Sequence, residues 1–183
     1  QEILIKSASD LIDLDHPNYQ FVAARLLLFS IRKSLYGRSR ELPQLEDHIV
    51  KCVGQDVYDG DIYTKYSKED IEKANGYIDH DRDFLFTYAG LRQVVDKYLV
   101  QDRSSGQVYE TPQFMYMMIA LTIFAEYPKE TRLNYVRRYY DAISRHKINI
   151  PTPIMAGVRT PLRQYASCVL VDIDDTLDSI FSS

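Results

Sequence analysis

One run of strand-forming residues near the C-terminal end limits the folds open to this chain more than any other feature. Ala166–Ile173 reads A-S-C-V-L-V-D-I and is apolar on both faces at its centre, as is typical of strands in parallel sheets that are covered on both sides. A parallel strand needs strand neighbours, joined by crossovers of a dozen or more residues, and none follow it. We therefore expect this segment and the helix start at 174–177 to open a β–α unit whose sheet is supplied elsewhere.

The rest of the chain is predicted to be helical, because apolar side chains recur at helical spacing. Pro17 and Gly37 delimit one helix, and Ser67 is a predicted N-cap with acids in the following turn. The helices that we expect cover Gln1–Ile12, 17–37, about 45–53, a segment after Ser67, about 81–98, 113–127 and 129–145, with a modest hairpin signal around Asp102–Gly106. The helical period ends at about Lys147, where three of the seven prolines fall within Ile150–Pro161.

Composition excludes several classes of protein. The chain is 45% apolar and 26% charged with a net charge of −4, which is ordinary for a globular protein and provides no basic field for nucleic acid. Its longest apolar stretches, such as Phe114–Ala125, are too short to span a bilayer. Two cysteines cannot form a disulfide framework, so we expect a reducing, cytoplasmic setting. Fifteen tyrosines stand out, but their amphipathic positions favour a packing role.

Residues with catalytic or metal-binding chemistry do not by themselves identify a site. The four histidines lie far apart in sequence, so no metal site is expected. The acid-rich segment Asp79–Asp83 is best interpreted as a helix N-terminus with acids in its first turn. The common phosphate-binding loops, G-x-x-x-x-G-K-[ST] and G-x-G-x-x-G, are absent.

A few single side chains remain as candidates. Thr152, between two prolines, and Ser167 can hold a phosphate group through their hydroxyls, although on pattern alone each is more often structural. Cys52 and Cys168 are both interpreted as small core residues. From the residues alone, function stays open between an incomplete enzyme and an all-helical interaction module.

A long motif near the C-terminal end narrows this choice. Residues 148–180 include the ungapped pattern P-T-P-x-M-x-G-x-R-T-P-x-R-Q-x-x-S-C and closely resemble the large (α) subunit of class I ribonucleotide reductase. Shorter segments resemble the same family in the family's order: P-N-Y-Q-F-V-A-A-R-L (17–26), I-D-H-D-R-D (78–83), Y-L-V (98–100), Y-E-T-P-Q-F (109–114) and Y-P-K-E-T-R-L (127–133). The resemblance covers essentially the whole chain.

The resemblance implies three parts. Residues 1–36 match the last helices of an ATP-cone, and residues 37–150 match a helical domain. Residues 151–183 match the entry into a ten-stranded α/β barrel that another chain would complete. The implied fold is therefore mainly α, followed by the first barrel strand. We expect an N-terminal portion of the subunit, either half of a naturally split subunit or a truncated piece of it.

The resemblance also implies roles for particular residues. Cys168 matches a redox-active cysteine on the first barrel strand, whose partner cysteine would lie outside this chain. Thr152 and Ser167 match positions that contact the substrate nucleotide. The positions that match allosteric effector sites are Asp175, Thr176, Leu177 and Lys33.

The implied activity of the complete enzyme is radical-based reduction of ribonucleoside diphosphates to deoxyribonucleotides, with this chain inactive alone. The chain would bind no metal or cofactor; a metal-containing small (β) subunit would supply the radical, and ATP or deoxynucleoside triphosphates would act as effectors. Thioredoxin or glutaredoxin would restore Cys168 by dithiol exchange. The other expected partners are the remaining part of the α subunit, a second α subunit and nucleoside diphosphates, but neither nucleic acid nor a membrane. The alternative is a non-catalytic nucleotide-binding or partner-docking module derived from that subunit.

Overall fold

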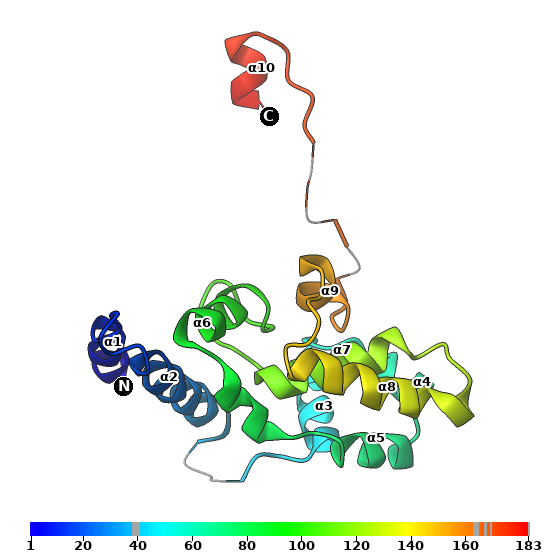
Figure 1. Ribbon diagram of the computed structural model, residues 1–183. Coiled ribbons are helices and arrows are strands. Elements are labelled where there is room, and N and C mark those ends of the chain that lie inside the picture. The colour runs from blue at the N-terminus through cyan, green and yellow to red at the C-terminus, as the bar shows by residue number, and fades with distance from the viewer. Residues whose placement is uncertain (38–40, 163–164, 167, 169, 183) are drawn as a thin grey trace.

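Helices form nearly all the regular structure of this chain. The computed structural model describes residues 1–37, 41–162, 165–166, 168 and 170–182 (Figure 1). Its helices are α1 (Glu2–Asp10), α2 (Tyr19–Tyr36), α3 (Leu45–Gly54), α4 (Ile62–Lys65), α5 (Lys68–Asn75), the 3-10 helix η1 (His80–Leu85), α6 (Tyr88–Lys97), α7 (Pro112–Ile123), α8 (Lys129–Ser144), α9 (Thr152–Gly157) and α10 (Leu177–Ser182). Within those described residues, none of the helices is long and apolar enough to cross a membrane.

Helix α7 is the centre of the core. Ten consecutive residues, from Pro112 to Leu121, are buried, as expected for a helix that is apolar all round. Pro112 occupies its first turn, where a missing N–H costs no hydrogen bond. Helices α8 and α9 and the 3-10 helix η1 contact it. The prediction of a buried helix here is confirmed, although the helix ends at Ile123.

Local start and stop signals also predicted the structure well. Ser67 accepts a hydrogen bond from the N–H of Asp70, whose carboxylate accepts one from the N–H of Ser67, so the capping box is formed. Gly37 ends α2 with a φ of 71°, a conformation that favours glycine. The hairpin signal is confirmed as an antiparallel bridge between Gln101 and Val108.

The single helix expected over about 81–98 is wrong. The 3-10 helix η1 ends at Leu85, Phe86 is extended, and α6 begins after Thr87, whose hydroxyl accepts a hydrogen bond from the N–H of Gly90. The break lets the Phe86 side chain enter the core, where it is 6% exposed. Two helices thus replace one because burial of an aromatic ring and a local cap outweigh continued helical hydrogen bonds.

The loss of helical structure after Lys147 is also only partly correct. Residues Thr152–Gly157 form α9, with Pro151 as its N-cap and Pro153 in its first turn. Prolines are tolerated there because first-turn N–H groups have no partner inside the helix. The short helix α4 was likewise not expected.

The strand expected at Ala166–Ile173 is not formed by those of its residues that the structure describes, 166, 168 and 170–173. They have no neighbouring strand to pair with, and a strand without a neighbour leaves its backbone groups unpaired. The helix expected after it does form as α10, with the hydroxyl of Thr176 accepting a hydrogen bond from the N–H of Ser179. Figure 1 shows α10 apart from the other helices, α1 to α9, which together form the helical body.

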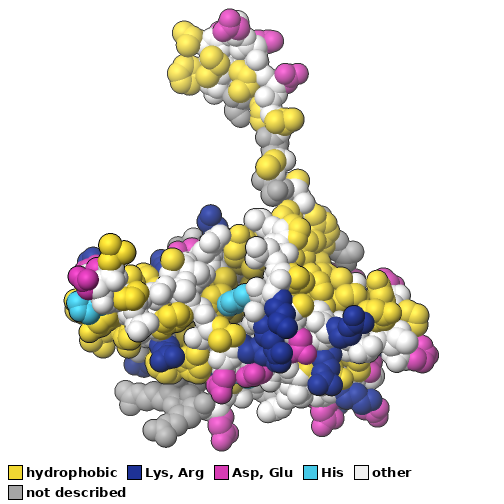
Figure 2. Space-filling view, viewed as in Figure 1, with side chains coloured by type: hydrophobic (Ala, Val, Ile, Leu, Met, Phe, Trp, Pro, Cys, Tyr) yellow, Lys and Arg dark blue, Asp and Glu magenta, His cyan; other side chains and the backbone are white. Residues whose placement is uncertain are grey.

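Apolar side chains are exposed along this C-terminal segment. Leu162 is 75% exposed, Leu170 99% and Phe181 85%. Figure 2 shows hydrophobic side chains gathered where the segment leaves the helical body. Exposed apolar side chains that gather in one patch are typical of a surface that a partner covers. Completion of a barrel by another chain stays a prediction.

Candidate functional site

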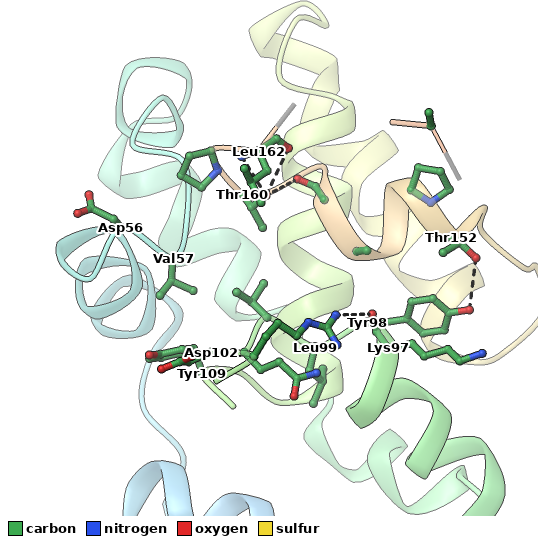
Figure 3. A pocket seen from close by; sticks show the side chains of 18 residues that line it. Asp56, Val57, Lys97, Tyr98, Leu99, Asp102, Tyr109, Thr152, Thr160 and Leu162 are labelled. Atoms are coloured by element: carbon green, nitrogen blue, oxygen red, sulfur yellow. Dashed lines mark hydrogen bonds between the residues drawn. The ribbon is translucent and has the colours of Figure 1, made fainter. Parts of the chain in front are cut away.

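A cavity of about 740 Å³ opens where three distant segments of the chain meet (Figure 3). One wall is the segment 97–103, which begins at the last residue of α6, together with Tyr109, whose N–H donates to the carbonyl oxygen of Val100. A second wall is the loop at Asp56 and Val57. The third wall is α9 together with residues that follow it, up to Ala166. The volume lies in the range of sites for small organic ligands. The walls meet only in the folded chain, so the cavity has no local sequence signature.

Among the predicted site residues that the structure describes, Thr152 is the one in a wall of this cavity. It is the first residue of α9, and its hydroxyl lies 3.5 Å from that of Tyr98, the C-cap of α6 (Figure 3). This contact lowers the pKa of the Tyr98 hydroxyl, chiefly because the Thr152 hydroxyl can donate to the phenolate. Two hydroxyls from separate elements therefore face each other at the cavity.

The other predicted site residues lie elsewhere or outside the described part. Ser167 falls outside the described residues. Cys168 is exposed and stands two residues beyond Ala166, which lines the cavity. The effector positions are all exposed, at the start of α10 and in the last turn of α2: Asp175, Thr176, Leu177 and Lys33. The structure thus brings Thr152 to the cavity, and Cys168 close to it along the chain, but places no effector position there.

Arg159 and Glu110, each next in the sequence to a residue that lines the cavity, form a buried ion pair that was not predicted from the sequence. The side chains of Arg159 and Glu110 are both 0% exposed. The guanidinium Nε donates to both carboxylate oxygens, at 3.1 and 3.0 Å, and Nη2 donates to Oε1. Paired, planar contacts of this kind are the strongest ionic hydrogen bonds in proteins. Burial lowers the pKa of Arg159, but the charge of Glu110 and the hydrogen bonds to Glu110 and Tyr58 together outweigh burial and raise it.

The Glu110 carboxylate has further partners in the core. It accepts a hydrogen bond from the Tyr58 hydroxyl at 2.5 Å and from the N–H of Val100 at 2.7 Å. The Tyr58 hydroxyl also lies 3.1 Å from Nε2 of His48. Burial, followed by the charge of Glu110, raises the pKa of Tyr58 well above its ordinary value. The network therefore connects α3, the segment before α7 and the residues after α9.

The acid-rich segment Asp79–Asp83 serves the structure, as expected. Asp79 caps η1 by accepting a hydrogen bond from the N–H of Asp81. Asp83 is buried and accepts from Arg32 at 2.9 Å and from Gln113 at 3.0 Å. Burial raises the pKa of Asp83 to about 6 despite its pairing with Arg32. No group of three metal-binding side chains gathers anywhere in the described part of the chain.

The buried His48 and the half-buried His80 predict how stability depends on pH. Burial lowers the pKa of His48 from 6.5 to about 4, so the unfolded chain binds a proton at this position between these values and the folded chain does not. Stability therefore falls as the pH drops from 7 to 4, by on the order of 3 kcal/mol for this group. His80, whose pKa burial also lowers to about 4, acts in the same direction. Asp83 acts in the opposite direction, because its folded pKa is raised.

Urea unfolding at pH 7 and pH 4.5 tests this prediction. The variant His48→Gln keeps a polar side chain beside Tyr58 but cannot titrate, so its stability should fall less on acidification than that of the wild type. The comparison isolates His48, since Asp83 and His80 are present in both proteins. An equal loss in both would contradict the role of His48.

The chain matches known proteins along almost its whole length. Residues 84–163 match the family described as "Ribonucleotide reductase, all-alpha domain". The "Ribonucleoside-diphosphate reductase 1 subunit alpha" of Escherichia coli K12 is 51% identical over 179 residues, which are 98% of this chain and 23% of that protein. The corresponding subunit of Haemophilus influenzae is also 51% identical, over 98% of this chain and 24% of that protein. That of Enterobacteria phage T4 is 47% identical over 180 residues, 98% of this chain and 24% of that protein.

The chain spans about a quarter of the length of these curated relatives. The matched family domain lies within the helical body and includes α7, α8, α9 and Arg159. By its sequence, the chain corresponds to an N-terminal portion of the large subunit of class I ribonucleotide reductase.

Proposed function

We propose that this chain forms the N-terminal part of a ribonucleoside-diphosphate reductase α subunit, which reduces ribonucleoside diphosphates to deoxyribonucleoside diphosphates once the remaining part is supplied. The observation that carries the proposal is the cavity wall formed by α9. Thr152 begins this wall, and Ala166, which stands two residues before Cys168 in the sequence, lines the same cavity. A nucleotide-binding hydroxyl and a reducing thiol thus belong to one short stretch of chain.

Thr152 and Ser167 hold the substrate nucleotide in this proposal, with Thr152 at its diphosphate. Cys168 is one of two thiols that reduce the ribose; its partner comes from the remaining part of the subunit. The 2′ carbon–oxygen bond is replaced by a carbon–hydrogen bond, and the oxygen leaves as water. The two thiols give up two electrons and two protons as they join in a disulfide, which thioredoxin or glutaredoxin then reduces by dithiol exchange.

Regulation and assembly complete the proposal. Asp175, Thr176 and Leu177 contribute to an effector site for deoxynucleoside triphosphates, and Lys33 contributes to a site for ATP. Residues 1–36, 37–150 and 151–183 are the end of an ATP-cone, a helical domain and the entry into the barrel. The β subunit supplies the radical, and two α subunits associate. The exposed apolar side chains after Leu162 support a contact with the rest of the barrel.

A chimaera tests this function. The chain replaces the matching 179 residues of the E. coli α subunit, and the completed subunit is assayed with its β subunit, thioredoxin and a ribonucleoside diphosphate. We expect turnover to the deoxyribonucleotide, because half of the replaced positions are identical. Nucleotide binding without turnover would favour the non-catalytic module instead. Neither binding nor turnover by a folded chimaera would contradict both.

A further inference from the structure

We infer that Arg159 is a positioning residue for the nucleotide site, because it holds together the two walls of the cavity that carry Thr152 and Tyr98 and so fixes these two residues relative to each other. The inference rests on the proposed function of Thr152 as a substrate contact. Arg159 lies in the interior of the helical body. Its side chain is 0% exposed and cannot itself contact a ligand, so it would act on the site through other residues.

Arg159 bonds to the elements that form two walls of the cavity and to the loop that continues from the third. Its Nη2 donates to the carbonyl oxygen of Tyr98 at 2.9 Å, and its Nη1 donates to that of Met155, in α9, at 2.5 Å. Its own carbonyl oxygen accepts a hydrogen bond from the N–H of Asp59 at 3.0 Å, in the loop that follows Val57. Three segments far apart in sequence therefore share one residue as their common hydrogen-bonding partner.

Glu110 prevents the guanidinium from moving. Its carboxylate binds Arg159 through Nε and Nη2 and is itself held by the N–H of Val100 at 2.7 Å and by Tyr58. Any shift of the guanidinium would leave a buried charge without its partner, which is costly. Only arginine has a planar fork that can bind the carboxylate and two carbonyl groups at once.

This arrangement fixes the position of Thr152. Met155, which Arg159 binds, is one helical turn after Thr152 in α9. Tyr98, which Arg159 also binds, carries the hydroxyl that faces Thr152 (Figure 3). Loss of the guanidinium would free both elements to shift. Misplacement of a positioning group by about 1 Å can reduce an enzyme's efficiency about a hundredfold.

The experiment compares paired variants in the completed subunit. Arg159→Met with Glu110→Gln removes both buried charges together, and the amide oxygen of the introduced glutamine can still accept from the N–H of Val100. The matched control is Arg132→Met with Asp70→Asn, which removes another ion pair, whose guanidinium is 3% exposed, between α8 and α5. Neither residue of the control lines the cavity. KM and kcat are measured for a ribonucleoside diphosphate, with the fraction of folded protein measured separately.

We expect KM to rise about 10- to 100-fold in the Arg159/Glu110 variant, with a smaller change in kcat, since Thr152 is proposed to hold the diphosphate and not the reacting carbon. The control pair should leave KM unchanged, because a purely structural loss reduces the amount of active enzyme and not its affinity. Arg159→Lys, which keeps the charge, should give an intermediate KM and decides the question if the paired variant does not fold.

The outcomes separate the inference from the function on which it rests. A wild-type KM in the paired variant and in Arg159→Lys would overturn the positioning role while leaving the proposed function intact. Equal increases in the paired variant and in its control would also overturn it. Absence of turnover by the wild-type completed subunit would instead contradict the proposed function.

Discussion

Replacing Cys168 with serine is expected to reduce nucleotide reduction by the completed subunit to background. A hydroxyl cannot supply the electron and the proton that a thiol gives up when it enters a disulfide, so the ribose would lack one of its two reducing equivalents. The side chain of Cys168 is exposed in this chain, where a substrate and a reductant can reach it. The measurement is the rate of deoxyribonucleotide formation with thioredoxin as reductant. Turnover by Cys168→Ser above background would refute the role proposed for Cys168.

Cys52, the other cysteine, provides the matched control. It is 1% exposed, and its Sγ lies 3.7 Å from Nε2 of His48 and 3.8 Å from the carbonyl oxygen of Tyr109. Burial raises the pKa of the Cys52 thiol to about 12, so little of the reactive thiolate forms at neutral pH. Cys52→Ala should therefore keep its turnover. If both variants lost activity equally, the loss would reflect folding and not thiol chemistry.

Much of the helical structure could be predicted because its signals are local. The N-cap at Ser67, the first-turn proline at Pro112 and the final glycine at Gly37 each act within one helical turn of their own position. The burial of α7 could be predicted for the same reason, since its sequence is apolar on every face. These features depend on no contact that is distant in sequence.

The errors lie where distant contacts decide the local structure. The break between η1 and α6 follows from burial of Phe86, which only the folded core provides. The apolar run at Ala166–Ile173 was predicted as a strand from its composition, but a strand forms only when a neighbour hydrogen-bonds to it. The described residues of the run have no such neighbour. The composition of the run favours a strand, whereas hydrogen bonding to a neighbouring strand decides whether the strand forms.

The candidate site could be predicted only in part, for the same reason. Motif resemblance located Thr152, which the structure places in a cavity wall. Nothing local indicated that Arg159 pairs with Glu110, 49 positions away, because charged side chains are mostly exposed. The one available signal was their setting: each stands in a short motif, Y-E-T-P or G-V-R-T-P, beside apolar segments. A charge in such a setting indicates a buried partner but does not identify it.

The buried ion pair of Glu110 and Arg159 should contribute strongly to the stability of the fold. We expect Glu110→Ala to lower the free energy of unfolding by about 3–5 kcal/mol, the usual cost of leaving one member of a buried ion pair without its partner. The Arg159 guanidinium would remain buried and would lose the carboxylate that it binds through two of its nitrogens. The Tyr58 hydroxyl and the N–H of Val100 would also lose their acceptor, and unpaired buried polar groups are costly.

A double-mutant cycle in urea unfolding separates the charge from the packing. Adding Arg159→Met to Glu110→Ala should recover part of the loss, because the uncompensated charge then disappears. The exposed pair of Lys6 and Asp10, at 77% and 61% exposure, is the comparison: Asp10→Ala should cost about 0.5 kcal/mol or less. Strictly additive losses for Arg159 and Glu110 would mean that the two charges do not depend on each other. If burial has removed both charges from the solvent, which would otherwise stabilise each charge alone, the effects of the two substitutions on the free energy of unfolding must be coupled.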